Sequence, residues 1–288
     1  MMDSWIQFFL DAKRAERRSP GTITTYTRRL NRFATWLDGR PISRATIRGY
    51  SGYLATEPLA AATHASYITD VIVFVHFLMD EEIMPYFKTT KLKPRVPSRL
   101  PAHYKIPQVK ALLAVADARE RAVIVMFLDT GIRVGELIQL RRTSFDADGH
   151  TTIIGKGDKE RSIWISPAAQ LVLDQYLATR TDTHPALFYS TQSAQGLTGN
   201  AVHQLIARVA KRAGIRGDVR RLCHSFRATF ARTLLGSGSI SIETLRVLLG
   251  HEDIAMSLHY AKLATDEVAE HKRRANPLGI ILGPTPFG

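Results

Sequence analysis

Four short segments in the second half of the chain bring together side chains that can bind an anion or move a proton. They read TGIRVGEL at 130–137, IGKGDKER at 154–161, HSFR at 224–227 and LLGH at 248–251, and Tyr260 follows nine residues after the last. Arginine stays protonated at any working pH, and its planar fork can grip two oxygens. Lysine and histidine can pass protons, and tyrosine becomes a nucleophile once its own proton is removed.

The more common catalytic arrangements are missing from the sequence. His251 begins the stretch HEDIA, but alanine stands where a zinc-binding HExxH helix needs its second histidine. The glycines at 155–157 lack the spacing of a phosphate-binding P-loop, and Asp146 and Asp148 are typical of a solvated turn. Cys223 is the single cysteine, which excludes an internal disulfide and a cysteine-rich zinc site. Two-metal chemistry needs clustered carboxylates, so we expect no metal in the site.

Each motif alone is weak, and the order of the motifs along the chain carries the interpretation. The pattern HxxR occurs twice, at 224–227 and at 271–274, and the second lies in a basic stretch that we interpret as surface charge. From 130 to 260, the four segments and the spaced tyrosine together resemble the tyrosine recombinase (phage integrase) family. Within that family the chain is most similar to two-domain Xer-type recombinases and transposon-encoded resolvases, and the resemblance extends over the whole chain.

The resemblance implies a role for each matching residue. The implied catalytic residues are Arg133, Lys156, His224, Arg227, His251 and Tyr260, with Glu136 in support. Tyr260 would attack a DNA phosphate to form a 3′-phosphotyrosyl link, while Lys156 would protonate the leaving 5′-oxygen. The two arginines would hold the phosphate, His224 would transfer a proton near the tyrosine, and His251 would hydrogen-bond the phosphate. Glu136 would orient Arg133 or a neighbouring site residue, although an ordinary i,i+3 pair on a helix surface is an alternative.

The same resemblance implies a site-specific recombinase that works through a Holliday junction in integration, excision or resolution. It implies no metal, cofactor or ATP, because the phosphotyrosyl ester keeps the energy of the broken bond. The implied partners are a double-stranded recombination site, three further copies of the chain in a homotetramer on two DNA sites, and an accessory or partner recombinase protein. One position departs from the family: Ala228 stands where many relatives carry a second histidine.

Two other functions stay open at this point. A type IB topoisomerase-like enzyme would use similar chemistry to relax supercoils, but the Xer-like first domain argues against it. A DNA-binding module that has lost its activity is the other alternative, and the complete set of matching catalytic residues argues against that.

The charge of the chain points to the same kind of partner. The 288 residues carry a net charge of +13, and the isoelectric point is near 10.1, so a polyanion is the first partner to consider. Residues 88–105 contain six basic and no acidic residues, and the basic residues of 1–87 all lie between 13 and 48. We expect DNA contacts from Arg28, Arg29, Arg32, Lys91, Lys93, Arg95, Lys159 and Arg161. For the first three, a solvated helix face is an equal alternative. For Lys159 and Arg161, the alternative is that they only flank the hairpin.

Hydrophobic periodicity and turn signals indicate the elements that must position these residues. Four helices are predicted in 1–87, one of them beginning at Ser19-Pro20 with a cap and a first-turn proline. A proline-containing basic linker follows at 88–105, then a catalytic domain at 106–275 and a tail at 276–288. Helices at 107–116, 122–128, 134–140, 167–177, 199–213, 225–235, 242–249 and 265–274 surround a predicted β-hairpin at 151–165. The predicted fold is mainly α with a small β-sheet: a four-helix, SAM-like core-binding domain and a tyrosine-recombinase catalytic domain. No membrane span or signal peptide is indicated, so we expect a soluble, cytoplasmic protein.

Overall fold

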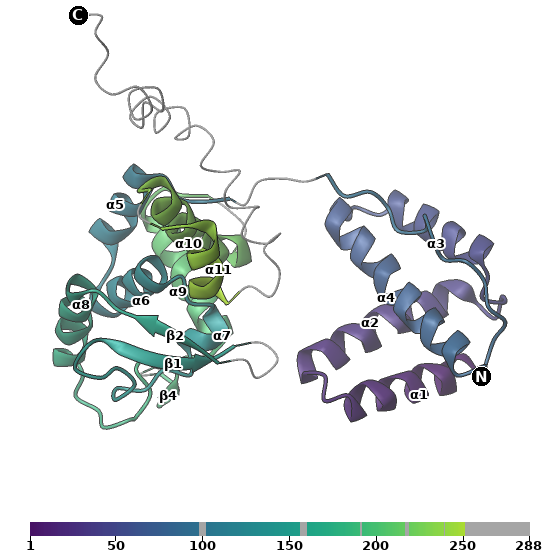
Figure 1. Cartoon of the computed structure of the whole chain (residues 1–288), viewed down its shortest axis with the longest axis horizontal. Coiled ribbons are helices and arrows are strands. Elements are labelled where there is room, and N and C mark those ends of the chain that lie inside the picture. The colour runs from purple at the N-terminus through teal and green to yellow at the C-terminus, as the bar shows by residue number, and fades with distance from the viewer. Residues whose placement is uncertain (98–101, 156–159, 191, 217–218, 239, 251–288) are drawn as a thin grey trace, which may run out of the picture. The chain divides into compact units, whose positions relative to one another are not determined.

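The chain divides into two compact units, Met1–Arg99 and Leu100–Gly288, so that the division falls inside the basic segment 88–105 (Figure 1). The computed structural model describes residues 1–97, 102–155, 160–190, 192–216, 219–238 and 240–250. The predicted helix at 265–274 lies outside these described residues.

The first unit consists of four helices, as predicted (Figure 1). They are α1 (Met2–Ala15), α2 (Pro20–Leu37), α3 (Arg44–Thr56) and α4 (Ala61–Asp80). The side chain of Ser19 accepts a hydrogen bond from the backbone N–H of Thr22, and Pro20 occupies the first helical position, where its missing N–H costs nothing. Ser43 and Thr46 form a reciprocal capping box at the start of α3. Local signals therefore set both of these helix starts.

Helix α4 lies at the core of the first unit. Its residues Val71, Phe74, Val75 and Leu78 are fully buried and share one apolar cluster with α1, α2 and α3. By length and mean hydropathy α4 could also cross a membrane, the single such helix among the described residues. The packing of its apolar side chains against three other helices is that of a core helix.

The beginning of the basic segment packs against the first unit. Leu92 is buried in the core of that unit, and Arg44 donates to the backbone carbonyls of Lys88 and Thr90. His76 and Thr89 approach within 2.6 Å through Nε2 and Oγ1. Residues 81–97 contain neither helix nor strand.

The described residues of the second unit are mainly helical and include two small sheets. Its elements are α5 (Ile106–Val115), α6 (Ala118–Thr130), α7 (Val134–Leu137), β1 (His150–Ile154), β2 (Glu160–Trp164), α8 (Pro167–Ala178), β3 (Tyr189–Ser190), β4 (Gln195–Gly196), α9 (Gly199–Arg212), α10 (Val219–Gly236) and α11 (Ile242–Leu249). The predicted hairpin is confirmed: β1 and β2 pair antiparallel, with Ile153 opposite Arg161. The pairing of β3 with β4 was not predicted, because two residues per strand are too few to show a period.

Helix α10 runs through the centre of the second unit and packs on α6 and α9 (Figure 1). Phe226, in the middle of the HSFR motif, is fully buried. Its ring lies 4.6 Å from that of Tyr104 and stacks on that of Phe127 at 5.6 Å between ring centres. The hydroxyl of Tyr104 donates to the backbone carbonyl of Leu222. These contacts fix the rotation of α10 about its axis and so determine where His224 and Arg227 lie.

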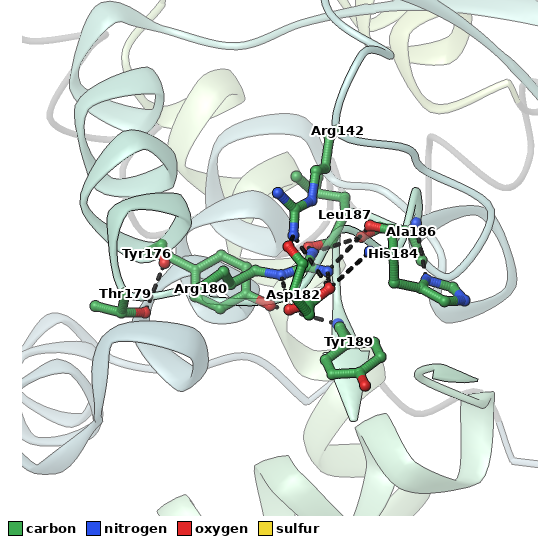
Figure 2. A network of polar contacts seen from close by, with 9 residues as sticks. All are labelled: Arg142, Tyr176, Thr179, Arg180, Asp182, His184, Ala186, Leu187 and Tyr189. Carbon is green, nitrogen blue, oxygen red and sulfur yellow. Dashed lines mark hydrogen bonds and ion pairs between the residues drawn. The ribbon is translucent and has the colours of Figure 1, made fainter. Parts of the chain in front are cut away.

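A set of polar contacts holds the loop between α8 and β3 (Figure 2). Asp182 lies between Arg142 and Arg180, and we call these three residues the loop triad. Arg180 Nε is 2.9 Å from Asp182 Oδ2, and Arg142 Nη2 is 3.1 Å from Asp182 Oδ1. Arg180 also donates to three carbonyls of the same loop, those of His184, Ala186 and Leu187. One buried guanidinium thereby satisfies backbone acceptors that have no sheet partner.

Candidate functional site

The TGIRVGEL segment forms a tight turn between α6 and α7. Gly131 ends α6 in the left-handed conformation, with φ of +61°. A Cβ at this position would lie 2.5 Å from Phe230 Cδ1, so the close approach of α10 excludes any larger residue. Arg133 follows as the N-cap residue of α7. The turn therefore places Arg133 at the N-terminal end of α7, a helix of one turn.

Arg133 and Arg161 share one buried carboxylate, that of Glu136. Arg133 Nη1 donates to Glu136 Oε1 at 2.8 Å, and the backbone N–H of Arg133 donates to Oε2, also at 2.8 Å. Arg161, which lies on β2, donates from Nη2 to the same Oε2 at 2.8 Å. We call these three residues the site triad. The Glu136 and Arg161 side chains are 3% and 8% exposed, whereas that of Arg133 is 35% exposed. Arg133 is thus the member that solvent, or a ligand, can reach.

The carboxyl group of Glu136 is ionised in this arrangement. Burial pushes its pKa upward, but the hydrogen bond from the Arg133 backbone and the charges of Arg161 and Arg133 outweigh burial, so the net pKa is lowered. A buried carboxylate between two guanidinium groups is the expected partner for both.

Arg227 lies in α10 and reaches both sides of the site. Its side chain is buried, 3% exposed. Nη1 donates to the backbone carbonyl of Gly131 at 2.6 Å, and Nη2 donates to that of Leu249. Arg161 Nη1 binds the adjacent carbonyl, that of Leu248, at 2.5 Å. Two arginines therefore hold the last carbonyls of α11, which have no partner within the helix itself.

His224 lies one helical turn before Arg227 on α10, and its ring is partly covered by the surrounding protein although the residue as a whole is exposed. Desolvation by the surrounding protein lowers the pKa of its ring, and the positive charges of Arg227 and Arg133 lower it further. The lowered pKa favours the neutral form of the ring, which can accept a proton.

The described part of the chain holds no group of three or more His, Cys, Asp or Glu side chains that could bind a metal ion. Among these described residues, the donors that converge are guanidinium groups and the imidazole of His224, which suit an oxyanion and a proton rather than a cation.

Comparison with known proteins supports this interpretation. The model of the Phage integrase family matches residues 105–267, and that of the Phage integrase N-terminal SAM-like domain matches residues 6–82. The chain belongs to the phage integrase family. Its members, the tyrosine recombinases, cut and rejoin DNA strands at specific sites, and the chain is an enzyme of this class. The resemblance predicted from the ordered motifs is thereby confirmed.

Relatives of this integrase-family chain match it over most of its length. The tyrosine recombinase XerD of Listeria monocytogenes serotype 4b (strain F2365) is 29% identical, covering 93% of this chain and 97% of its own. The tyrosine recombinase XerA of Pyrococcus horikoshii is 28% identical, covering 88% of this chain and 95% of its own. The crystal structure of XerH bound to a palindromic difH substrate, a post-cleavage complex, shares the fold with a TM-score of 0.71. It is 21% identical and covers 91% of this chain and 81% of its own.

The departure at Ala228 has a local explanation in this family member. Ala228 is fully buried in a small apolar cluster formed by α10 and α11, with Phe230, Ala231, Leu245 and Leu249. A methyl group at this position fills the contact between the two helices.

The predicted site residues of the integrase-family chain fall into three groups. Arg133, Glu136, His224 and Arg227 come together, as do their partners at the end of α11. Arg161, predicted to contact DNA, instead points inward and binds Glu136 and Leu248, so its side chain is placed as a buried partner of the site. The remaining predicted residues of the catalytic domain, Lys156, Lys159, His251 and Tyr260, lie outside the described residues.

The predicted DNA contacts of the first unit also differ among themselves. Arg28 is exposed, and so are Lys91, Lys93 and Arg95. Arg29 pairs with Asp70 at 2.5 Å and Arg32 pairs with Glu57 at 3.0 Å, and both guanidinium groups lie over the ring of Tyr67. Those two arginines therefore have acidic and aromatic partners within the unit itself.

Sequence reasoning missed the glycine that ends α11. Gly250 is left-handed, with φ of +61°, and a Cβ there would lie 2.7 Å from Arg161 Cδ. A glycine directly after two leucines at a helix end is a recognisable stop signal. The contact with Arg161 is not readable from the sequence, because the two residues lie 89 positions apart.

Proposed function

We propose that this chain is a two-domain Xer-type recombinase in which Arg133 and Arg227 hold one DNA phosphate for attack by Tyr260. Residues 1–87 form the core-binding domain, 88–105 the linker, 106–275 the catalytic domain and 276–288 the tail. The observation that supports the proposal is the convergence of Arg133, Glu136, His224 and Arg227 from α7 and α10. The motifs that carry these residues are far apart in the sequence, and each matches the family.

The two arginines can stabilise the negative charge that develops on the phosphate during the reaction. Attack on a phosphodiester builds negative charge on its non-bridging oxygens, and fixed cationic donors stabilise that charge without reorganising. Arg133 is held at one edge by Glu136 while the side chain stays 35% exposed, which leaves it accessible to a phosphate. Arg227 is fixed by the carbonyls of Gly131 and Leu249, so its positive charge is fixed in place beside the same turn.

Two proton transfers accompany the exchange of bonds. The hydroxyl of Tyr260 gives its proton to the neutral ring of His224, and the tyrosine oxygen forms a bond to phosphorus. The bond between phosphorus and the 5′-oxygen breaks, and Lys156 supplies the proton for that oxygen. His251 hydrogen-bonds the phosphate. The 3′-phosphotyrosyl ester and the 5′-hydroxyl that result can recombine with a partner strand by the reverse steps, with no cofactor and no ATP.

The partner of this reaction is a double-stranded recombination site. Four copies of the chain act on two such sites through a Holliday junction, in integration, excision or resolution, with an accessory or second recombinase protein as a further partner. The exposed cations Arg28, Lys91, Lys93 and Arg95, together with Lys159, bind backbone phosphates, which contribute affinity rather than sequence recognition. The reaction takes place in the cytoplasm, where the chromosome is accessible.

The assignment of Tyr260 is tested by trapping the covalent intermediate. The protein first selects its site from a random-sequence DNA pool, and the substrate is a duplex of that sequence. The duplex carries a nick near the scissile position, because the short cleaved fragment is then lost and the strand cannot be religated. We expect the wild-type chain to form a covalent protein–DNA adduct on a denaturing gel. Tyr260→Phe is expected to form none while binding the same DNA with unchanged affinity, since only the nucleophilic oxygen is lost.

The matched control is Tyr86→Phe, which removes the hydroxyl of a tyrosine that is 78% exposed in the first unit. It should form the adduct at the wild-type rate. An adduct with Tyr260→Phe would show that another residue is the nucleophile. Relaxation of a supercoiled plasmid that lacks the selected site would instead favour the topoisomerase alternative.

A further inference from the structure

Arg161 occupies an unusual place for a cation on a β-hairpin. It lies on β2 opposite Ile153, and its side chain is 8% exposed. Rather than pointing to solvent, the guanidinium reaches away from the hairpin and contacts two other elements, α7 and the end of α11. Burying a guanidinium costs several kcal/mol unless its charge is compensated. The contacts with Glu136 and with the carbonyl of Leu248 provide that compensation.

The contact with α7 sets the orientation of a carboxylate. Glu136 Oε2 accepts from Arg161 and from the backbone N–H of Arg133, each at 2.8 Å. With Oε2 held by two donors, the rotation of the carboxylate is fixed, and Oε1 lies 2.8 Å from Arg133 Nη1. Arg161 therefore determines where the Arg133 side chain is held, although it does not touch Arg133 through a hydrogen bond.

The contact with α11 fixes the residues that lead into the last motif. Arg161 Nη1 donates to the carbonyl of Leu248 at 2.5 Å, and its Cδ occupies the space that a Cβ of Gly250 would need. Glycine at 250 thus lets the side chain of Arg161 pass close beneath the end of α11. Since Arg227 binds the carbonyl of Leu249, the helix end is held at two successive carbonyls.

We propose that Arg161 is a positioning residue for strand cleavage, which locks Glu136, and through it Arg133, to the end of α11. This inference rests on the phosphate-binding role proposed for Arg133. Misplacement of a phosphate-binding group by a fraction of an ångström to about 1 Å is costly, because catalysis depends on fixed geometry. Arg161 therefore affects the reaction through the orientation of Arg133 and does not itself bind DNA.

The test compares cleavage at one scissile phosphate with and without its negative charge. Cleavage is measured with the selected nicked duplex carrying either a normal phosphodiester or a methylphosphonate, tested as separate diastereomers, at the scissile position. The methyl group removes the charge that Arg133 stabilises. A defect that acts through Arg133 should therefore shrink on the methylphosphonate, whereas a general loss of folded structure should reduce cleavage of both substrates equally.

The variants separate charge from geometry. Arg161→Met keeps the length but loses charge and donors, and we expect phosphodiester cleavage to fall by about 10- to 100-fold with a much smaller loss on the methylphosphonate. Arg161→Lys keeps the charge but cannot bind Glu136 and Leu248 together, so an intermediate loss is expected. DNA affinity should stay at the wild-type value for both variants.

Arg180→Met is the matched control, because Arg180 is also a buried guanidinium that binds a carboxylate and backbone carbonyls. It is expected to lower the melting temperature without distinguishing the two substrates. An equal loss on both substrates for Arg161→Met, or no loss, would overturn the positioning role. If Arg133→Ala itself fails to distinguish the substrates, the fault lies with the phosphate-binding role of Arg133 instead.

Discussion

Two clusters in the second unit are built from the same parts, a carboxylate between two arginines, yet they belong to different regions. They are the site triad, Arg133–Glu136–Arg161, and the loop triad, Arg142–Asp182–Arg180. In each triad one arginine is buried, at 8% exposure in the first and 4% in the second. In each the other arginine is about one third exposed, at 35% and 30%. The composition and the exposure of the arginines therefore do not distinguish the triads, although the Asp182 side chain is 23% exposed and that of Glu136 only 3%.

The difference lies in what the buried arginine connects. Arg180 binds carbonyls within seven residues of itself, so the buried arginine of the loop triad closes one loop, and Arg142 joins Asp182 from a segment 40 residues earlier (Figure 2). Arg161 binds a carbonyl 87 residues further along the chain and a carboxylate 25 residues before it. The site triad thus joins β2, α7 and α11. Each of these three elements overlaps one of the four motifs. In this chain, the buried arginine that joins separate motif-bearing elements lies at the candidate site, whereas the one that closes a loop lies outside it.

The sharpest way to break this comparison is to remove the exposed arginine of each triad. Arg133→Ala should lower the rate of adduct formation by about 100- to 1000-fold, the usual cost of losing one donor to a developing oxyanion. Arg142→Ala removes a guanidinium of similar exposure that also pairs with one carboxylate, and we expect cleavage within about twofold of wild type. Single-turnover cleavage of the selected nicked duplex measures both. Similar losses in the two variants would mean that the triads do not differ in function.

The second comparison removes the charge of each carboxylate and follows pH. Arg180 lowers the pKa of Asp182 against the opposing effect of desolvation, and Glu136 also has a lowered pKa. A lowered pKa stabilises the folded state above the unfolded pKa near 4, and that stability is lost as pH falls through the folded pKa. Asp182→Asn and Glu136→Gln should therefore both lower stability at pH 7 and flatten its decline below about pH 4.

Only one of the two substitutions should affect the reaction. Glu136→Gln is expected to slow cleavage at pH 7 by about tenfold or more, because Arg133 loses the charge that orients it. Asp182→Asn should leave the cleavage rate of the folded protein unchanged. Urea unfolding between pH 3 and 7 measures the stability, and single-turnover cleavage measures the rate. A cleavage defect in Asp182→Asn that equals that of Glu136→Gln would contradict the distinction.

Local patterns predicted the elements of this fold well, because the signals are contained within each element. Ser19 and Pro20 predict the start of α2, and the β-branched runs at 151–154 and 162–165 predict the hairpin. The same approach started α10 too late, at 225 rather than at Val219. In the HSFR segment of that helix His224 is exposed, but the next three residues are all buried, and burial on several sides of the helix obscures the period.

The partners of individual charges could not be predicted, because they depend on contacts between distant residues. Arg161 was expected either to contact DNA or only to flank the hairpin, and nothing near it in sequence reveals Glu136 or Leu248. Glu136 was correctly paired with Arg133, since three residues along a helix bring them together, but its burial and its second arginine were not foreseen. Motif order identified the family, whereas tertiary contacts decide which cation binds substrate and which one supports it.

The same distinction between a paired and an exposed arginine extends to α2, where the smallest effect is expected. Arg28 is exposed, whereas its neighbour Arg29 pairs with Asp70 at 2.5 Å and lies over the ring of Tyr67. Binding of a phosphate by a cation releases a counterion, so each such contact adds about 0.9 to the slope of log affinity against log salt. Arg28→Ala should weaken DNA binding a few-fold at moderate salt and reduce that slope by about 1.

Arg29→Ala, the matched substitution, removes a cation whose charge Asp70 already balances. Its slope should stay within about 0.3 of the wild-type value, while the first unit loses stability because Asp70 is left without its partner. Fluorescence anisotropy with the selected duplex at four or more salt concentrations gives the slopes, and thermal unfolding gives the stability. Equal changes of slope in both variants would mean that Arg29 leaves Asp70 for a phosphate when DNA binds, and that pairing within the free protein does not decide which arginines contact DNA.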